Sequence, residues 1–297
     1  MKPAHAKIGR MTTHTIPLGD NRTLEVHELG DPAGFPVISH HGSPGSGLPY
    51  ARWATPGVRL LSYDRAGYGG STRNTGRDIA AVVTDIEAIA DEFDLERFAT
   101  WGISGGGPHA LACAALCGNR LTAAASLAAV APWGADGLDW LAGMGEGNLE
   151  EFDLVLAGET ALRPTIERDR LQMIDSSLDG LRAVYDSLLG DADRAVLQGR
   201  LIEHLHADAL HALESSADGW IDDNLAFVRP WGFELAAITR PVLVVQGGDD
   251  RFVPRSHGEW LAAHVPGAEA WINDADGHLT LMENLVPDVH DWLLSHS

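Results

Sequence analysis

The sequence predicts an α/β protein with a mostly parallel, doubly wound sheet and an inserted helical cap. Strand-like runs alternate with helical patterns over residues 1–131 and again over 241–297, and this alternation is typical of a parallel sheet covered by helices on both faces. Between these parts, residues 132–240 lack strand-like runs and are dominated by helix formers, tryptophans and acidic residues. We therefore expect a core of residues 1–131 and 241–297, with a cap of residues 132–240.

The first part of the core opens with two alternating segments joined by the turn Gly19-Asp20-Asn21-Arg22, which favours an antiparallel pair. The expected strands of this part are residues 12–18, 23–29, 35–40, 58–64, 98–102 and 121–131. Apolar residues spaced three and four apart predict a helix over 79–93, and a second helix closes at Gly118-Asn119.

The second part of the core resumes with the continuous apolar run Pro241-Val242-Leu243-Val244-Val245-Gln246, which is typical of a central parallel strand. A helix at 256–264, a strand at 268–272 and a helix at 281–294 follow. Reactive groups in such sheets gather at the carboxyl ends of strands. The loops after residues 40, 64, 102, 246 and 272 are therefore the places to look for chemistry.

Charge and cysteine content limit the partners and the compartment. The 42 acidic against 21 basic residues give a formal net charge of −21, which argues against nucleic acid or anionic membranes as partners. The N-terminus lacks the apolar segment of a secretory signal. Cys113 and Cys117 lie four apart on one predicted helix, a poor geometry for a disulfide. We expect a cytoplasmic protein that acts on a small molecule.

Ser104 lies at the centre of Gly102-Ile103-Ser104-Gly105-Gly106, between a predicted strand and an alanine-rich helix. A serine on so sharp a turn is presented above the sheet, and glycines are needed beside it because side chains would collide with the backbone. Such a hydroxyl requires a base and a carboxylate to become a nucleophile.

The base and the acid are expected after the last two core strands. His278 follows the strand at 268–272, beside a glycine. Asp250 and Asp249 both follow the strand at 241–246, and we favour Asp250 for its place before Arg251 and Pro254. Two further aspartates near the histidine, at positions 274 and 276, are interpreted as polar loop residues.

Five motifs in this order resemble the α/β-hydrolase fold. They are His41-Gly42-Ser43-Pro44, Asp64-Arg65-Ala66-Gly67-Tyr68-Gly69-Gly70-Ser71, Gly102-Ile103-Ser104-Gly105-Gly106, Gly248-Asp249-Asp250-Arg251-Phe252-Val253-Pro254 and Asp276-Gly277-His278. The order of nucleophile, acid and histidine is the order that this fold requires. The resemblance covers nearly the whole chain outside the cap.

The resemblance implies an oxyanion hole formed by the backbone N–H groups of Ser43 and Gly105. It also implies that Asp64 and Arg65 form a scaffold motif without a catalytic role. His41 is expected to shape the oxyanion loop rather than to act as a second base.

Serine at the turn favours acyl chemistry, because relatives that open epoxides or cleave carbon–halogen bonds use aspartate there. The leading expectation is an esterase, with lactonases, carbon–carbon bond hydrolases and perhydrolases also open. The loop from His41 to Ser46 is similar to that of proline iminopeptidases, which bind a substrate amine with acidic cap residues. The acidic residues of the cap include Glu146, Glu150, Glu151, Asp153 and Glu159. A receptor-like binding module that retains the fold is the alternative of another class.

No metal or cofactor is expected. His204, His206 and His211 lack a carboxylate at a suitable helical offset, and neither a phosphate loop nor a dinucleotide fingerprint is present. The cap supplies apolar side chains for the roof of a pocket, which favours a moderately hydrophobic substrate. They are Trp133, Trp140, Met144, Phe152, Trp220, Trp231 and Phe233. The oligomeric state is left open.

Overall fold

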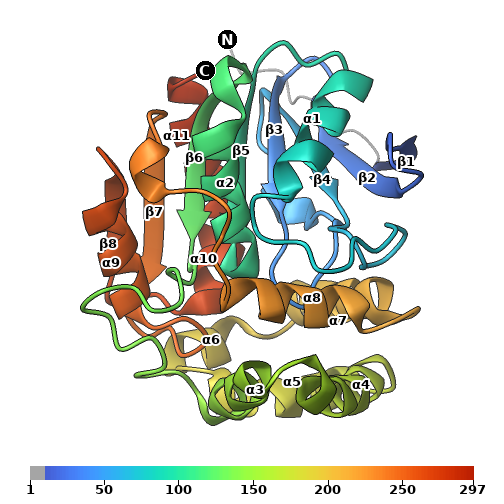
Figure 1. Ribbon diagram of the computed structural model, residues 1–297, viewed down its shortest axis with the longest axis vertical. Coiled ribbons are helices and arrows are strands. Elements are labelled where there is room, and N and C mark those ends of the chain that lie inside the picture. The colour runs from blue at the N-terminus through green and yellow to red at the C-terminus, as the bar shows by residue number, and fades with distance from the viewer. Residues whose placement is uncertain (1–10) are drawn as a thin grey trace.

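A computed structural model describes residues 11–297, so the N-terminal stretch considered for a targeting signal lies almost entirely outside it. One eight-stranded sheet runs through the protein in the order β1-β2-β4-β3-β5-β6-β7-β8 (Figure 1). The strands are β1 (Thr12–Pro17), β2 (Thr23–Gly30), β3 (Phe35–His40), β4 (Val58–Tyr63), β5 (Phe98–Ile103), β6 (Leu121–Leu127), β7 (Val242–Gly247) and β8 (Glu269–Asn273).

The pairing of the strands confirms the predicted fold class. β1 and β2 form an antiparallel pair, and β2 is also antiparallel to β4. The remaining neighbours are parallel. Every residue of β5, β6 and β7 is buried, whereas β1 and β8 expose several side chains at the edges of the sheet. The uninterrupted apolar runs of the sequence therefore occupy the centre of the sheet, as expected for parallel strands covered on both faces.

Helices cover the two faces of the sheet. In Figure 1, α2 crosses in front of β5 and β6, while α11 lies behind the same strands. The helices of the core are α1 (Val82–Glu92), α2 (Gly107–Leu116), α9 (Arg255–His264), α10 (His278–Asn284) and α11 (Val286–Ser295).

The structure differs from the sequence prediction at two places that matter for the site. The strand expected to reach residue 131 ends at Leu127, because Ala128 has a φ of 46°, outside the strand conformation. The single helix expected over 281–294 is two helices that meet at Leu285. Pro287 lies in the first turn of the second helix, where its missing N–H costs no hydrogen bond, whereas it would interrupt a continuous helix.

Six α-helices lie between β6 and β7, below the carboxyl ends of the strands in Figure 1, and we call them the cap. They are α3 (Glu146–Ala157), α4 (Glu159–Ile174), α5 (Leu178–Tyr185), α6 (Asp191–Val196), α7 (Arg200–Leu213) and α8 (Asp218–Phe227). The domain boundaries at residues 131 and 241 stay a prediction. Across the described residues, no helix has the length and apolar character that crossing a membrane would need.

Candidate active site

The turn that carries Ser104 joins β5 to α2. Ser104 has a φ of 54°, in the left-handed region where a side chain is strained. A Cβ at Gly106 would lie 2.6 Å from the carbonyl oxygen of His41, and one at Gly102 would lie 2.9 Å from the amide nitrogen of Gly107. Both glycines are therefore required by the close backbone approach that presents the Ser104 hydroxyl at the end of β5.

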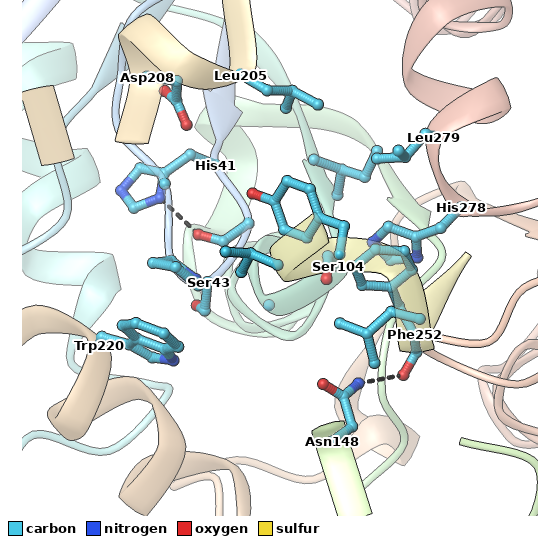
Figure 2. A pocket seen from close by; sticks show the side chains of 18 of the residues that line it. His41, Ser43, Ser104, Asn148, Leu205, Asp208, Trp220, Phe252, His278 and Leu279 are labelled. Atoms are coloured by element: carbon cyan, nitrogen blue, oxygen red, sulfur yellow. Dashed lines mark hydrogen bonds between the residues drawn. The ribbon is translucent and has the colours of Figure 1, made fainter. Parts of the chain in front are cut away.

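A histidine–carboxylate pair lies beside this turn. Nδ1 of His278 is 2.8 Å from Oδ2 of Asp250, so the ring donates from Nδ1 and leaves Nε2 available. Ser104 and His278 line the same cavity, and Figure 2 shows their side chains next to each other. The contacts of the described residues include no hydrogen bond between the Ser104 hydroxyl and His278. Such bonds are often long before substrate binds and shorten in the complex.

Asp250 is held by three further donors. Its Oδ1 accepts from the backbone amides of Phe252 at 2.9 Å and Val253 at 2.8 Å. Its Oδ2 accepts from Nε2 of Gln246 at 3.2 Å. The loop after β7 thus fixes the carboxylate of Asp250 in one orientation against His278.

The other aspartates near His278 make different contacts. Oδ2 of Asp249 accepts from the amide of Ala192 in the cap at 3.1 Å, so this carboxylate points away from the ring. Asp274 forms an exposed ion pair with Arg255, and Asp276 accepts a hydrogen bond within its own loop. None of these three carboxylates bonds to His278 among the described contacts.

His278 is the first residue of α10, and a side chain from α6 of the cap domain accepts hydrogen bonds from the amides at that end of the helix. Oδ2 of Asp193 accepts from the amide of His278 at 2.9 Å. Oδ1 accepts from the amides of Leu279 at 2.7 Å and Thr280 at 3.1 Å. Asp193 is fully buried, and a side chain at Gly277 would collide with it. The first-turn amides of a helix otherwise lack partners. The N-cap residue, Gly277, has no side chain to accept from them, so Asp193 of the cap domain supplies the acceptor.

The surroundings of His278 favour its protonated form. Burial alone lowers the pKa of the ring, but the charge and hydrogen bond of Asp250, together with the charge of Asp193, outweigh it and raise the pKa above its usual value. Phe252 stacks on the ring at a centroid distance of 4.5 Å and an angle of 22°. The ring is thereby held in one orientation, with nearby negative charge to stabilise an imidazolium.

The two predicted oxyanion donors lie next to each other. A Cβ placed on Gly105 would be 2.9 Å from the Cβ of Ser43, and a Cβ on Gly42 would be 3.5 Å from the Cβ of Ser104. The loop after β3 therefore packs directly against the serine turn. The two loops are therefore adjacent, and the oxyanion hole formed by the N–H groups of Ser43 and Gly105 stays a prediction.

Arg65 holds the loop after β3 in place. Its guanidinium donates to the carbonyls of His41 at 2.6 Å and Gly42 at 3.0 Å, and to Oγ of Ser43 at 3.0 Å. Asp223 of α8 pairs with Arg65 at 2.6 Å and accepts from the Ser43 hydroxyl. Arg65 and Asp223 are buried, whereas Gly42 and Ser43 are partly buried at the cavity wall. The scaffold role predicted for Arg65 therefore corresponds to hydrogen bonds that hold the backbone of the loop after β3.

His41 is neutral and shapes the same loop. Its Nε2 accepts from the amide of Arg65 at 3.0 Å, and its Nδ1 donates to the carbonyl of Gly42 at 2.7 Å. Burial, reinforced by the charge of Arg65, lowers the pKa of His41 to about 3. With both ring nitrogens occupied, this histidine has none left to act as a base.

The cavity above Ser104 has a volume of about 390 Å³ and lies between the strand ends and the cap, within the size range of small-molecule sites. Two of the aromatic residues expected to form its roof, Phe152 and Trp220, do line it. Trp140 instead packs edge-on between Trp133 and Phe152, and Trp231 stacks on Phe233. Met173 and Phe227 belong to the lining although the sequence did not single them out.

Carboxyl groups supply the charge in this cavity. Burial raises the pKa of Glu151 to about 7, against the hydrogen bonds that Trp220 and Asn224 donate to it. Burial also raises the pKa of Asp208 to about 7, against hydrogen bonds from Ser46. In the described part of the chain, neither lysine nor arginine lines the cavity. Apart from the histidines, the side chains of the wall that can carry charge are therefore acidic.

The three helix histidines and the two cysteines occupy separate places. His204 stacks on Tyr50 at 4.7 Å, and His206 contacts the carbonyl of Ser176 at 2.9 Å. Nε2 of His211 lies 3.0 Å from Glu25 and 2.9 Å from Asp64. Cys113 and Cys117 are both free and buried, as the helix spacing predicted.

Three polar residues of this region were not found from the sequence. Asp193, Asp208 and Asp223 lie on separate cap helices, far along the chain from the residues they contact. The cap carries many acidic residues, and nothing in the local pattern separates these three from the others. Gln246 could have been found, because a polar side chain ends an otherwise apolar central strand.

Comparison with known proteins identifies the family. Residues 36–285 match the alpha/beta hydrolase fold. A 2-hydroxy-6-oxononadienedioate/2-hydroxy-6-oxononatrienedioate hydrolase of Cupriavidus pinatubonensis is 27% identical, over 91% of this chain and 89% of its own. A proline iminopeptidase of Xanthomonas citri is 32% identical, over 39% of each chain. The structure of an esterase from Exiguobacterium antarcticum superimposes with a TM-score of 0.71 at 20% identity, covering 95% of this chain and 100% of its own. The match to the family spans most of the chain and agrees with the sheet order, and the chain therefore belongs to the alpha/beta hydrolase fold family.

Proposed function

We propose that this hydrolase cleaves a carboxylic ester, or a similar acyl bond, of a small and moderately hydrophobic substrate through an acyl-enzyme. Ser104 is the nucleophile, His278 the general base and Asp250 the carboxylate that orients it. The backbone N–H groups of Ser43 and Gly105 receive the oxyanion.

In the first step, Nε2 of His278 takes the proton of the Ser104 hydroxyl while Oγ attacks the carbonyl carbon. The tetrahedral intermediate collapses when the imidazolium returns this proton to the leaving alkoxide. A water molecule then gives a proton to His278 and attacks the acyl-enzyme. The carboxylic acid leaves, and Ser104 recovers its proton. Asp250 stabilises each imidazolium in this sequence without becoming protonated.

The observation that carries the proposal is the pairing of a strained serine with an oriented histidine in one cavity. Ser104 has its φ of 54° at the carboxyl end of β5, and His278 is fixed at 2.8 Å from Asp250 beside it. Strained backbone persists only where its surroundings hold it, and it is common at active sites. A purely structural serine would not need a glycine-lined turn that faces a histidine–carboxylate pair.

A serine-directed fluorophosphonate tests the nucleophile. We expect wild-type protein and Ser187→Ala, which changes another serine of the cavity wall, to be labelled once per chain. Ser104→Ala should not be labelled, and it should lower kcat on a p-nitrophenyl ester by about 10⁴–10⁶-fold. Normal turnover in Ser104→Ala would rule out the assignment. Absence of labelling in the wild type would instead favour a receptor-like module.

The cavity favours neutral or amine-bearing substrates over dicarboxylates. Glu151 and Asp208 contribute carboxyl groups, while the described residues place no arginine or lysine in its wall. Bidentate arginine contacts are the usual means of binding a substrate carboxylate. We therefore do not extend the substrate named for the Cupriavidus relative to this chain.

An aminopeptidase of the proline-iminopeptidase kind is the second candidate. Of the five acidic cap residues named above, Glu151 faces the cavity, whereas Glu146, Glu150, Asp153 and Glu159 are exposed. A carboxylate in this place would pair with a substrate amine. A panel of p-nitrophenyl esters, lactones and prolyl arylamides separates the candidates. Rapid cleavage of the prolyl amide with no cleavage of esters would replace the first proposal by the second.

A further inference from the structure

A second group of chemically capable side chains lies outside the catalytic cavity, where the cap meets the first strands. Glu25 and His27 come from β2, Asp64 follows β4, and His211 comes from α7. One nitrogen or oxygen atom from each lies within 4.8 Å of all the others. None of the four residues belongs to the wall of the cavity that holds Ser104.

The distances from the two histidines to the two carboxylates are near those between the ligands of one metal ion, with either oxygen of Asp64 able to bind. Nε2 of His211 lies 3.0 Å from Oε1 of Glu25 and 2.9 Å from Oδ2 of Asp64. Nε2 of His27 lies 3.5 Å from Oε1 of Glu25 and 3.8 Å from Oδ1 of Asp64. Ligands bound tetrahedrally to zinc at about 2.0–2.1 Å are about 3.3 Å apart. The four distances lie on both sides of this value.

His27 supplies an independent sign that a ligand belongs in the group. The residue is 1% exposed, and its Nε2 is buried without a hydrogen-bond partner. Its other nitrogen, Nδ1, lies 3.1 Å from Oγ1 of Thr13. Histidines that bind metals commonly donate the proton of one ring nitrogen to such a partner, which leaves a lone pair on the other. The lone pair of His27 then points at Glu25 and Asp64.

Hydrogen bonds satisfy His211 but not His27, because Nε2 of His211 lies 2.9 Å from Oδ2 of Asp64. A protonated Nε2 of His27 would need an acceptor, but its two carboxylate neighbours lie at 3.5 and 3.8 Å, beyond the range of a good N–H···O bond. A divalent cation bound among the two histidines and the two carboxylates would give the unpartnered nitrogen of His27 a bond.

Backbone amides orient Asp64, and solvent can reach Glu25 and His211. Asp64 accepts from the amides of Gly47 at 2.7 Å and Gly70 at 2.9 Å, and each oxygen keeps a lone pair for a metal. The side chains of Glu25 and His211 are 22% and 29% exposed, which gives an ion a route from solvent. Two imidazoles and two carboxylates suit zinc, and four protein ligands make a closed, structural site.

We propose that Glu25, His27, Asp64 and His211 form a zinc site that fastens α7 of the cap to β2 and β4 of the core. Its role is structural, because the ligands come from both parts and lie apart from the cavity wall.

Elemental analysis of the intact protein, purified without chelator, tests the site. We expect about one zinc ion per chain. Competition with a chromophoric chelator should give a zinc affinity at least tenfold weaker in His27→Gln and in His211→Gln. The matched control is His206→Gln, because this histidine lies on the same helix and contacts Ser176 instead. That variant should bind zinc as the wild type does.

Thermal unfolding supplies a second readout that does not depend on activity. Removing zinc with EDTA should lower the Tm of the wild type and of His206→Gln by about 5 °C, because an ion that binds only the folded state stabilises it. EDTA should not change the Tm of His27→Gln. If His211→Gln does not fold, His27→Gln carries the test, since its Nε2 makes no hydrogen bond to lose. Equal zinc affinity in the wild type and His27→Gln, with no effect of EDTA on either Tm, would overturn the proposal.

Discussion

The replacement Asp193→Ala tests whether the cap positions His278, the proposed general base. The change removes the acceptor of three amides, those of His278, Leu279 and Thr280, at 2.9, 2.7 and 3.1 Å. These amides open α10 and lie in the interior, so water cannot readily replace the carboxylate. The variant should therefore affect both the stability of the fold and the placement of the base.

The expected loss in the free energy of unfolding follows from the number and kind of hydrogen bonds that Asp193 accepts. Replacing an N-cap residue by alanine costs about 0.5–2 kcal/mol, and a hydrogen bond to a charged group contributes about 1.5–3 kcal/mol. The bonds share one acceptor group and do not add. Burial also raises the pKa of Asp193, so desolvation offsets part of the gain. We expect a net loss of about 2–3 kcal/mol, which corresponds to a fall in Tm of about 5–10 °C.

The kcat of Asp193→Ala should fall by more than the loss of folded protein explains. Misplacing a catalytic group by about 1 Å can cost about 100-fold in rate, so we expect kcat of Asp193→Ala to fall by about 10- to 100-fold at a temperature where the variant is folded. The charge of Asp193 also helps to raise the pKa of His278. The acidic limb of the pH–rate profile should consequently move to lower pH.

Asp191→Ala is the matched control, because this aspartate lies on the same helix and is exposed. Asp193→Asn should be intermediate, since one amide oxygen remains to accept hydrogen bonds. Thermal melts, ester kinetics and pH profiles of the three variants make the comparison. If Asp193→Ala matches Asp191→Ala in Tm, kcat and pH dependence, the reasoning about the cap is refuted.

Three further outcomes are expected. Arg65→Met should lower the free energy of unfolding by about 1.5–3 kcal/mol, because it removes the hydrogen bonds from the guanidinium to Asp223 and to the carbonyl of His41, while Arg77 still pairs with Asp223. Urea unfolding measures this change, and a value under about 1 kcal/mol would contradict it. The wild-type kcat/KM should fall as the pH decreases through the pKa of His278, because only a neutral histidine acts as a base. The charge of Asp250 raises this pKa above its usual value of 6.5. A flat pH–rate profile between pH 6 and 8 would refute the assignment of His278 as the base. Glu151→Gln should lower kcat/KM on a prolyl arylamide about tenfold or more beyond its effect on an ester, if the carboxylate binds the amine; equal effects on both substrates would exclude that role.

The sequence alone determined the fold class and the segments that meet at the site. Uninterrupted apolar runs indicate buried parallel strands, and parallel strands bring their carboxyl ends to one edge of the sheet. Ser104, Asp250 and His278 could therefore be assigned to one place from local patterns. Glycines beside Ser104 were informative because close backbone approach excludes other residues.

Only the tertiary structure decided which cap residues support the site. Asp193 and Asp223 contact groups more than 80 positions away in the chain, and helical periodicity does not encode which face of an acidic helix meets which loop. The same holds for Glu25, His27, Asp64 and His211, which join two strands to a cap helix. Local sequence fixes the direction of a side chain on its own element, whereas the packing of elements against one another fixes which side chains meet.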